Sequence, residues 1–257
     1  MKNIAYRIAA TIFLCLPLAL MMVSCGKDDD EDTEGYERVL YSELNLPDDG
    51  SNGPQFEITD EDFESVANDL GVDTEALKAV WKVDTGGISG FIPDGNGGNL
   101  PTILFQGHIF WQQLRSLGLN PEDYEKGNED ILYKKMTKAH YVGGLGEWDR
   151  LKHAIFINER AAYCSASWGM FQIMGFNYKS CGCATVLEFV DRMKKSPVDQ
   201  LKLFAGFLKS NASMLNALKR LDWKAFAKLY YGTYYYQNQY DEKLWRAYAS
   251  LIHQSKQ

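Results

Sequence analysis

The sequence lacks an excess of positive charge, a dense set of cysteines and an apolar run long enough to cross a bilayer. Its net charge is −7, from 27 basic and 34 acidic residues, which argues against the basic face of nucleic-acid-binding proteins. Five cysteines in 257 residues exclude a disulfide-dense miniprotein. The chain also has no repeat of about 20–50 residues. Its hydrophobic content of 46% excludes a disordered protein and suffices for one domain of about 200 residues.

The first 24 residues have the pattern of a secretion signal. Lys2 and Arg7 frame the start of an almost wholly apolar run at residues 8–23, which is short for a membrane span and suits a signal-peptide core. The small residues before Cys25 resemble the bacterial lipobox, which implies cleavage before Cys25 and lipidation of that residue. The alternative is an ordinary secretory signal with an incidental cysteine. We expect residues 1–24 to be a lipoprotein signal peptide, and several acyl chains to anchor the mature protein firmly.

Residues 25–56 carry most of the negative charge. Six of the seven residues from Asp28 to Glu34 are acidic and must stay solvated, and a turn-rich stretch without hydrophobic periodicity follows. The formal charge is +2 over residues 1–24, −8 over residues 25–56 and −1 over residues 57–257. We therefore expect a flexible acidic tether at 25–56, beginning with the lipidated Cys25, and one near-neutral domain at 57–257.

The acidic run also bears on where the protein resides. Directly after a lipidated cysteine, such a run resembles the export signal of bacterial surface lipoproteins, and a simple acidic spacer is the alternative. We expect a cell-envelope protein that is lipid-anchored to the outer membrane, with exposure at the cell surface left open.

Three cysteines remain in the domain: Cys164, Cys181 and Cys183. In an oxidising compartment they allow one disulfide, from Cys164 to Cys181 or Cys183, with the third thiol free. Cys-Gly-Cys alone lacks the ligand number and spacing of a zinc site, so we expect no metal. No nucleotide-binding loop is found, so we expect no cofactor.

Apolar periodicity and capping residues predict a mostly helical domain. The expected helices cover about residues 59–70, 74–83, 108–116, 147–163, 185–194, 199–217, 222–230 and 240–253. Two short β-like runs, Ser89–Ile92 and Thr102–Phe105, flank a Gly- and Asn-rich turn and predict one small hairpin. The fold class that follows is α+β, predominantly α-helical.

The densest cluster of small and polar residues is SASWGMFQIMG at Ser165–Gly175. Small residues let a backbone approach a ligand or a neighbouring helix closely, and Gln172 adds two donors and one acceptor among apolar neighbours. A buried core helix with one hydrogen-bonded Gln172 accounts for the same letters. The spacing alone leaves both interpretations open.

This segment and four others resemble, in the same order, the N-acetylmuramidase domain of phage endolysins and related bacterial proteins. The matching segments are Ala79–Phe91, PTILFQGHIF at 101–110, Gly143–Leu151 with EWDRL, SASWGMFQIMGFN at 165–177, and YYGTYYYQNQYDEKL at 230–244. The resemblance spans about residues 60–245. It implies a lysozyme-like domain with a small β-hairpin that cleaves peptidoglycan between N-acetylmuramic acid and N-acetylglucosamine.

Asp84 is the candidate catalytic residue. Glycoside hydrolysis needs a protonated carboxyl that donates to the leaving oxygen, normally with a second carboxylate or a held water. Asp84 stands where a lysozyme-like arrangement has this acid, at the end of a helix beside a glycine-rich wall and a hairpin. The resemblance therefore implies that Asp84 is the general acid.

The sequence departs from the family pattern at three candidate site positions. Asp84 stands in place of Glu, which draws the carboxyl back by one C–C bond, ~1.5 Å. Gln106 also replaces a Glu, and an amide can hold substrate but cannot titrate. Tyr231 replaces an Asn that resembles a substrate or water ligand. Misplacing a catalytic group by about 1 Å can cost ~100-fold in rate, so these changes put activity in question.

The matched segments supply the candidate substrate-binding residues, which are Gln106, His108, Glu147, Ser167, Gln172, Tyr230 and Tyr231. Glu147 equally suits a helix N-terminus, where an acid interacts favourably with the helix dipole. His108 equally suits a structural role with a hydrogen bond to the backbone. The tyrosine run at 230–240 could stack on sugar rings or form a buried seam between helices.

Three functions remain open from the sequence. The first is a lipid-anchored muramidase that acts on peptidoglycan glycan strands, with Asp84 as the acid. The second is a non-catalytic glycan-binding or interaction lipoprotein on the same scaffold, which the changes at Asp84, Gln106 and Tyr231 favour. The third is a lytic transglycosylase, which can work with one carboxyl and the sugar's own hydroxyl. In each case we expect a monomer with peptidoglycan and a membrane as partners, and no nucleic acid.

Overall fold

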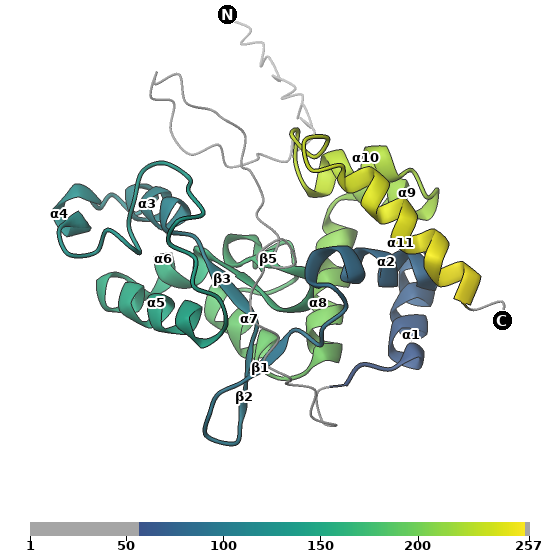
Figure 1. Ribbon diagram of the computed structural model, residues 1–257, viewed down its shortest axis with the longest axis horizontal. Coiled ribbons are helices and arrows are strands. Elements are labelled where there is room, and N and C mark those ends of the chain that lie inside the picture. Colours follow the sequence, from purple (N-terminus) through teal and green to yellow (C-terminus); the bar gives the residue numbers. More distant parts are fainter. Residues whose placement is uncertain (1–56, 255–257) are drawn as a thin grey trace, which may run out of the picture. The chain divides into compact units, whose positions relative to one another are not determined.

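The computed structural model describes residues 57–254 (Figure 1). The predicted signal peptide at 1–24 and the predicted tether at 25–56 with the lipidated Cys25 lie outside the described residues. Within the described part, no helix is long and apolar enough to span a membrane.

Helices dominate the domain, and two small antiparallel sheets complete it, which confirms the predicted α+β class. The α-helices are α1 (Asp60–Leu70), α2 (Thr74–Thr85), α3 (Gly107–Ser116), α4 (Glu122–Glu125), α5 (Gly144–Ile157), α6 (Glu159–Cys164), α7 (Val186–Met193), α8 (Pro197–Ser210), α9 (Ala212–Lys219), α10 (Trp223–Tyr230) and α11 (Tyr240–Gln254). Of two short 3-10 helices, η3 (Gly169–Phe171) lies inside the segment of small residues at Ser165–Gly175, and η4 (Gly175–Asn177) begins at its last residue.

The first two helices have the ends that the sequence predicts. Thr59 forms a capping box with Asp62 at the start of α1, and Gly71 ends that helix with a φ of +65°. The Asp73 carboxylate caps α2 by accepting from the backbone N–H of Glu75 at 2.9 Å. Helix α2 continues to Thr85, two residues beyond the predicted end. Asp84 therefore lies inside its last turn rather than after the helix.

Two long predicted helices are each divided at an asparagine. The predicted helix at 147–163 breaks at Asn158 between α5 and α6, and the one at 199–217 breaks at Asn211 between α8 and α9. The Asn158 side chain accepts from the N–H of Ala161 at 2.9 Å, and the Asn211 side chain from the N–H of Met214 at 3.0 Å. Each asparagine thus replaces backbone hydrogen bonds at the start of a new helix.

The predicted hairpin is partly wrong in its pairing. Strand β1 (Phe91–Pro93) pairs with β2 (Asn99–Pro101), so the second strand of the hairpin ends before Thr102. Strand β3 (Ile103–Phe105), which was predicted as a hairpin arm, pairs instead with β4 (Ala166–Trp168). Strand β4 also pairs with β5 (Ile173–Met174), so the Ser165–Gly175 segment is strand and 3-10 helix rather than a core helix. The second sheet thereby joins two of the matched segments.

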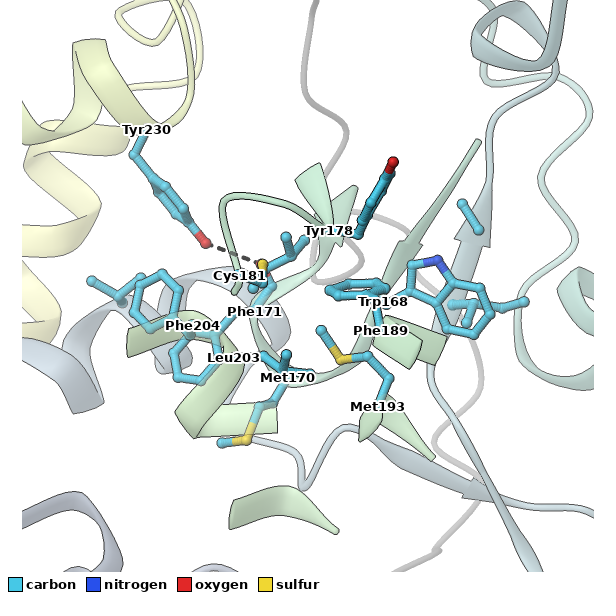
Figure 2. Packing of buried hydrophobic residues seen from close by; sticks show 14 of the residues in the cluster. Trp168, Met170, Phe171, Tyr178, Cys181, Phe189, Met193, Leu203, Phe204 and Tyr230 are labelled. Atoms are coloured by element: carbon cyan, nitrogen blue, oxygen red, sulfur yellow. Dashed lines mark hydrogen bonds between the residues drawn. The ribbon is translucent and has the colours of Figure 1, made fainter. Parts of the chain in front are cut away.

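Fully buried aromatic side chains form the core around β4 and η3 (Figure 2). The Trp168 ring lies 5.7 Å from that of Trp148 and 6.4 Å from that of Phe189, both edge to face. Phe171 stacks on Phe204 of α8 at 4.0 Å. Because α2 and α8 both pack on η3, this core fixes where the end of α2 lies.

The predicted disulfide, from Cys164 to Cys181 or to Cys183, is not formed. Cys164, Cys181 and Cys183 are all buried free thiols. Cys164 ends α6, whereas the other two lie in the turn before α7, and all three belong to the hydrophobic core. Burial raises the pKa of Cys164 to about 11 and also raises that of Cys181. These cysteines behave as small core residues in the structure.

Candidate active site

The carboxylate of Asp84 is completely buried and is bound by two neighbouring tyrosines. Tyr230, the last residue of α10, donates its hydroxyl to Asp84 Oδ2 at 2.7 Å. Tyr231 donates its hydroxyl to Oδ1 at 3.0 Å. The two tyrosine rings meet edge to face with centroids 4.8 Å apart. Three of the predicted site residues therefore form one cluster, although Asp84 precedes Tyr230 by 146 positions in the chain.

The same cluster holds the end of α2 against η3. The Tyr230 hydroxyl donates to the carbonyl oxygen of Phe171 at 3.0 Å. The dashed line at Tyr230 in Figure 2 marks this hydrogen bond. The hydroxyl of Thr85, next to Asp84, reaches the carbonyl oxygen of Met170 at 3.4 Å. The Trp81 indole, one turn earlier, donates to the carbonyl of Ile88 at 2.7 Å and fixes the loop that leaves the helix. The end of α2 is thus bonded to η3 through Thr85, and to the loop that follows the helix through Trp81.

Ser167 and Gln172 bind each other rather than open solvent. The Ser167 hydroxyl donates to Gln172 Oε1 at 2.8 Å, and Gln172 Nε2 donates to the carbonyl of Gly169 at 2.9 Å. Gln172 has a φ of +43°, a left-handed conformation that costs a residue with a side chain about 1–2 kcal/mol. Its side-chain bonds stabilise this turn at the end of η3, next to the Phe171 carbonyl that accepts from Tyr230.

Gln200 of α8 is a site residue that the sequence did not single out. Its side chain is buried and accepts from the N–H of Met170 at 2.9 Å while donating to the carbonyls of Met193 at 2.9 Å and Gly90 at 3.3 Å. A Cβ at Gly90 or at Gly169 would collide with it. The two glycines, both with positive φ, were the signal that a side chain must pass close to this backbone.

Gln106 is buried at the beginning of α3, beside β5. Its Nε2 donates to the sulfur of Met174 at 3.3 Å, and its backbone N–H donates to the carbonyl of Ser165 at 2.9 Å. Met174 is the register partner of Ser167, so Gln106 adjoins the Ser167–Gln172 pair through the sheet.

Glu147 has a structural position, which is the alternative that its place in a helix first turn allowed. It is completely buried, and Oε2 accepts from the N–H of Phe105 at 2.9 Å and from Arg150 Nη1 at 2.8 Å. Oε1 accepts from the N–H groups of Val142 and Gly143 at 2.8 and 3.2 Å. Both oxygens are therefore engaged in joining α5 to β3, and the geometry favours this role over substrate binding.

His108 lies in the first turn of α3 with only 5% of its surface exposed. Its ring stacks on Tyr133 with centroids 6.2 Å apart. Burial lowers the pKa of His108 to about 4, so the ring is neutral near pH 7. Among the described residues Nδ1 has no hydrogen-bond partner, so the backbone bond suggested for a structural histidine is not made through this atom.

The tyrosine run contains both buried and exposed side chains. Tyr230, Tyr231, Tyr235 and Tyr240 are buried, and the Tyr231 and Tyr240 rings pack at 4.2 Å between α10 and α11. Tyr234 and Tyr236 are exposed, with ring centroids 6.4 Å apart. The run thus forms a helix seam that leaves two aromatic faces accessible.

In residues 57–254, no group of three or more histidine, cysteine or acidic side chains is arranged to bind a metal ion. The hydrogen bonds of Asp84 and Tyr230 bring together one carboxyl, two phenols and the backbone of η3.

Comparison with known proteins agrees with the geometry. A sequence model described as Muramidase, N-acetylmuramidase, matches residues 73–252. Four chains of solved structures match, and one of them is an endolysin of the Burkholderia phage AP3. That endolysin is 37% identical with a TM-score of 0.68, over 79% of this chain and 74% of its own. No curated protein matches this chain.

The fold is that of a lysozyme-like domain, which confirms the fold expected from the sequence. The family match covers well over half of the chain. The chain belongs to the N-acetylmuramidase family.

Proposed function

We propose that this protein hydrolyses peptidoglycan at the bond between N-acetylmuramic acid and N-acetylglucosamine, with Asp84 as the general acid. The observation that carries the proposal is the position of Asp84, in the last turn of α2 and bonded to Tyr230 and Tyr231 at 2.7 and 3.0 Å. A carboxyl withdrawn from water in this way is the kind of group that donates a proton to a leaving oxygen. The exposed Tyr234 and Tyr236 are proposed to stack on sugar rings.

The proposal gives each neighbouring segment a supporting task. Gln200 and the Ser167–Gln172 pair hold the wall of small residues against which α2 ends. Gln106 is proposed to bind substrate through its amide. Glu147 is not used as a second carboxylate, because both of its oxygens accept hydrogen bonds inside the domain.

The test is the digestion of purified sacculi, with release of muropeptides carrying reducing ends as the readout. Asp84→Asn keeps the size of the side chain and removes the acid, so we expect the release to fall about 100-fold or more. Asp149→Asn is the matched control, because Asp149 is an exposed carboxylate of α5 that pairs with Lys152. Equal activity of Asp84→Asn and the wild type would refute the assignment of Asp84.

A second function, glycan binding without cleavage, is favoured by one specific observation. Asp84 is 0% exposed and both of its oxygens are occupied by tyrosines, one of which stands in place of the family's Asn. This function predicts that the protein is retained on sacculi while no muropeptides appear. Activity found only in the Asp84→Glu, Gln106→Glu double variant would show that the natural site has lost its acid geometry.

The products also separate hydrolysis from lytic transglycosylation. Mass spectrometry of the released fragments would show 1,6-anhydro ends if the sugar's own hydroxyl attacks, and hydrated reducing ends if water attacks. We propose hydrolysis, so hydrated ends are the expected result.

We further propose that the protein is a monomeric lipoprotein of the cell envelope, anchored in the outer membrane through Cys25. The support is the sequence of residues 1–56 alone. Replacement of Cys25 by Ser should abolish metabolic labelling with a fatty acid and release the protein from the membrane fraction.

A further inference from the structure

The hydroxyl of Tyr230 has two acceptors within reach but only one hydrogen. Its oxygen lies 2.7 Å from Asp84 Oδ2 and 3.0 Å from the carbonyl oxygen of Phe171. A carbonyl oxygen can only accept, whereas a phenol can donate once and accept as well. Both contacts can be full hydrogen bonds only if a proton on Asp84 is donated to the phenol oxygen.

Two proton arrangements fit the same positions of the heavy atoms. When Asp84 is ionised, the Tyr230 hydrogen points at Oδ2. When Asp84 is protonated, Oδ2–H donates to the Tyr230 oxygen, and the Tyr230 hydrogen turns to the Phe171 carbonyl. The change requires only rotation of one hydroxyl, because neither the carboxyl nor the ring has to move.

We propose that Tyr230 is a positioning residue whose hydroxyl hydrogen follows the ionisation of Asp84, so that this buried carboxyl keeps a hydrogen bond to Tyr230 in both states. The inference rests on the proposed role of Asp84 as a general acid. Such an acid passes its Oδ2 proton to the leaving glycosidic oxygen, whose bond to the sugar carbon breaks, while Oδ2 keeps the electron pair of its O–H bond. The Tyr230 hydrogen then turns back from Phe171 to Oδ2, and water adds to the sugar carbon and gives up a proton. A water proton later restores the acid. Burial makes this continuity important, because a buried polar group without a partner is penalised.

Tyr231 differs from Tyr230 in its bonding and serves as an internal comparison. It donates at 3.0 Å to Oδ1, the oxygen that carries no proton in either arrangement. A hydrogen bond to a charged acceptor is stronger than one to a neutral acceptor. Tyr231 therefore favours the ionised form, whereas Tyr230 supports both forms.

Tyr240 and Lys243 of α11 lie beside Tyr231. The Tyr240 ring packs on that of Tyr231, and the Lys243 ammonium lies 5.0 Å from the centroid of Tyr240. These groups stay in place in both tyrosine variants below and act equally on them.

The test is infrared difference spectroscopy of the full-length protein during a pH titration, with the Asp84 band identified by its absence in Asp84→Asn. Tyr231→Phe should raise the titration midpoint of Asp84 by about one pH unit, which is tenfold in proton affinity. Tyr230→Phe should shift it by less than half as much, because both forms lose one bond. In Tyr231→Phe, where Tyr230 is the tyrosine left on Asp84, a tyrosine C–O band should change together with Asp84 as the Tyr230 hydrogen changes its acceptor. In Tyr230→Phe only the smaller change of Tyr231, which keeps Oδ1 as its acceptor, should remain.

Equal midpoint shifts in the two variants, or a tyrosine band that stays constant in Tyr231→Phe while Asp84 titrates, would overturn the proposal. If Tyr230→Phe fails to fold, the tyrosine band of Tyr231→Phe decides the question alone. The readout needs no turnover. A protein that shows this coupling yet releases no muropeptides would refute the proposed hydrolysis and leave this inference standing.

Discussion

Glu147 and Arg150, three positions apart on α5, form an ion pair of 2.8 Å in which neither side chain is more than 6% exposed. Arg150 also donates to the carbonyls of Phe105 and Asp130 at 2.9 and 2.7 Å. The pair therefore connects α5 to β3 and to the loop before Ile131. Its contribution should be to stability rather than to chemistry.

Replacing Glu147 by Gln should destabilise the domain by about 3–5 kcal/mol, because Arg150 would be left as a buried charge without its counterion. For a domain of this size that corresponds to a fall in Tm of roughly 10 °C. Asp149→Asn on the same helix is the control, because its pair with Lys152 is exposed and such pairs are worth less than about 1 kcal/mol. Thermal unfolding followed by circular dichroism measures both variants. A fall in Tm of the same size in the two variants would contradict the structural role of Glu147.

Replacing Gly169 by Ala should cost about 3 kcal/mol. The residue has a φ of +68°, which strains any L side chain, and the new methyl group would collide with Gln200. Gly95→Ala is the matched control, since its φ is +78° but nothing lies within 4 Å of the added carbon, so only about 1 kcal/mol of backbone strain is expected. Urea unfolding measures the free energy of unfolding of each variant, provided that the slope m is unchanged, and the difference between them gives the cost of the contact with Gln200. Equal losses would mean that the contact with Gln200 does not matter.

His108 should make stability depend on pH on the acid side. Its pKa is about 4 in the folded protein against an ordinary 6.5, so between these values the unfolded chain binds a proton that the folded chain does not. The free energy of unfolding should therefore fall as pH drops from 6.5 to 4, by about 3 kcal/mol in total, and should not change above 6.5 for this reason. Urea unfolding of the wild type and His108→Gln at pH 7 and pH 5 measures the effect. The slope attributable to His108 must vanish in the variant.

The three thiols of the domain should be unreactive in the native state. Burial raises the pKa of Cys164 to about 11, which keeps the thiol protonated near neutral pH, and the packing denies access to reagents. Iodoacetamide without reductant should leave Cys164, Cys181 and Cys183 unmodified in native protein and modify all three in urea. Peptide mapping by mass spectrometry gives the answer. A Cys164–Cys181 peptide that needs reductant before it can be alkylated would show that the disulfide forms after all.

The sequence predicts helix ends where one residue type makes the end, and fails where apolar periodicity runs through a break. Thr59 and Gly71 mark α1 directly through their capping geometry. Asn158 and Asn211 also cap helices, but the hydrophobic stripe continues on both sides of each, so the pattern alone joins two helices into one. Strand pairing fails for a different reason. The partner of β3 lies more than 60 positions further on, and nothing local to Thr102–Phe105 specifies it.

In the candidate site too, the sequence predicts some features, whereas others depend on tertiary contacts. Asp84 and the pair Tyr230–Tyr231 stand out only through the family resemblance, and their mutual contact is a product of tertiary packing between α2 and α10. Gln200 belongs to no recognisable motif. The sequence pattern predicts that a single amide on an amphipathic helix faces solvent, whereas the Gln200 side chain is buried. Glu147 was named as a candidate substrate ligand from its motif, yet its four hydrogen bonds are all internal.

The contacts of Gln200 also constrain the order in which this domain can change. The three atoms nearest to a Cβ at Gly169 all belong to Gln200, whereas a Cβ at Gly90 would also meet the backbone nitrogen of Met170. Shortening residue 200 to Ala would therefore relieve this contact at position 169, where only the backbone strain of about 1 kcal/mol would remain, while Met170 would still obstruct a side chain at position 90. Loss of this amide would thus make a later loss of Gly169 less costly, but not a later loss of Gly90.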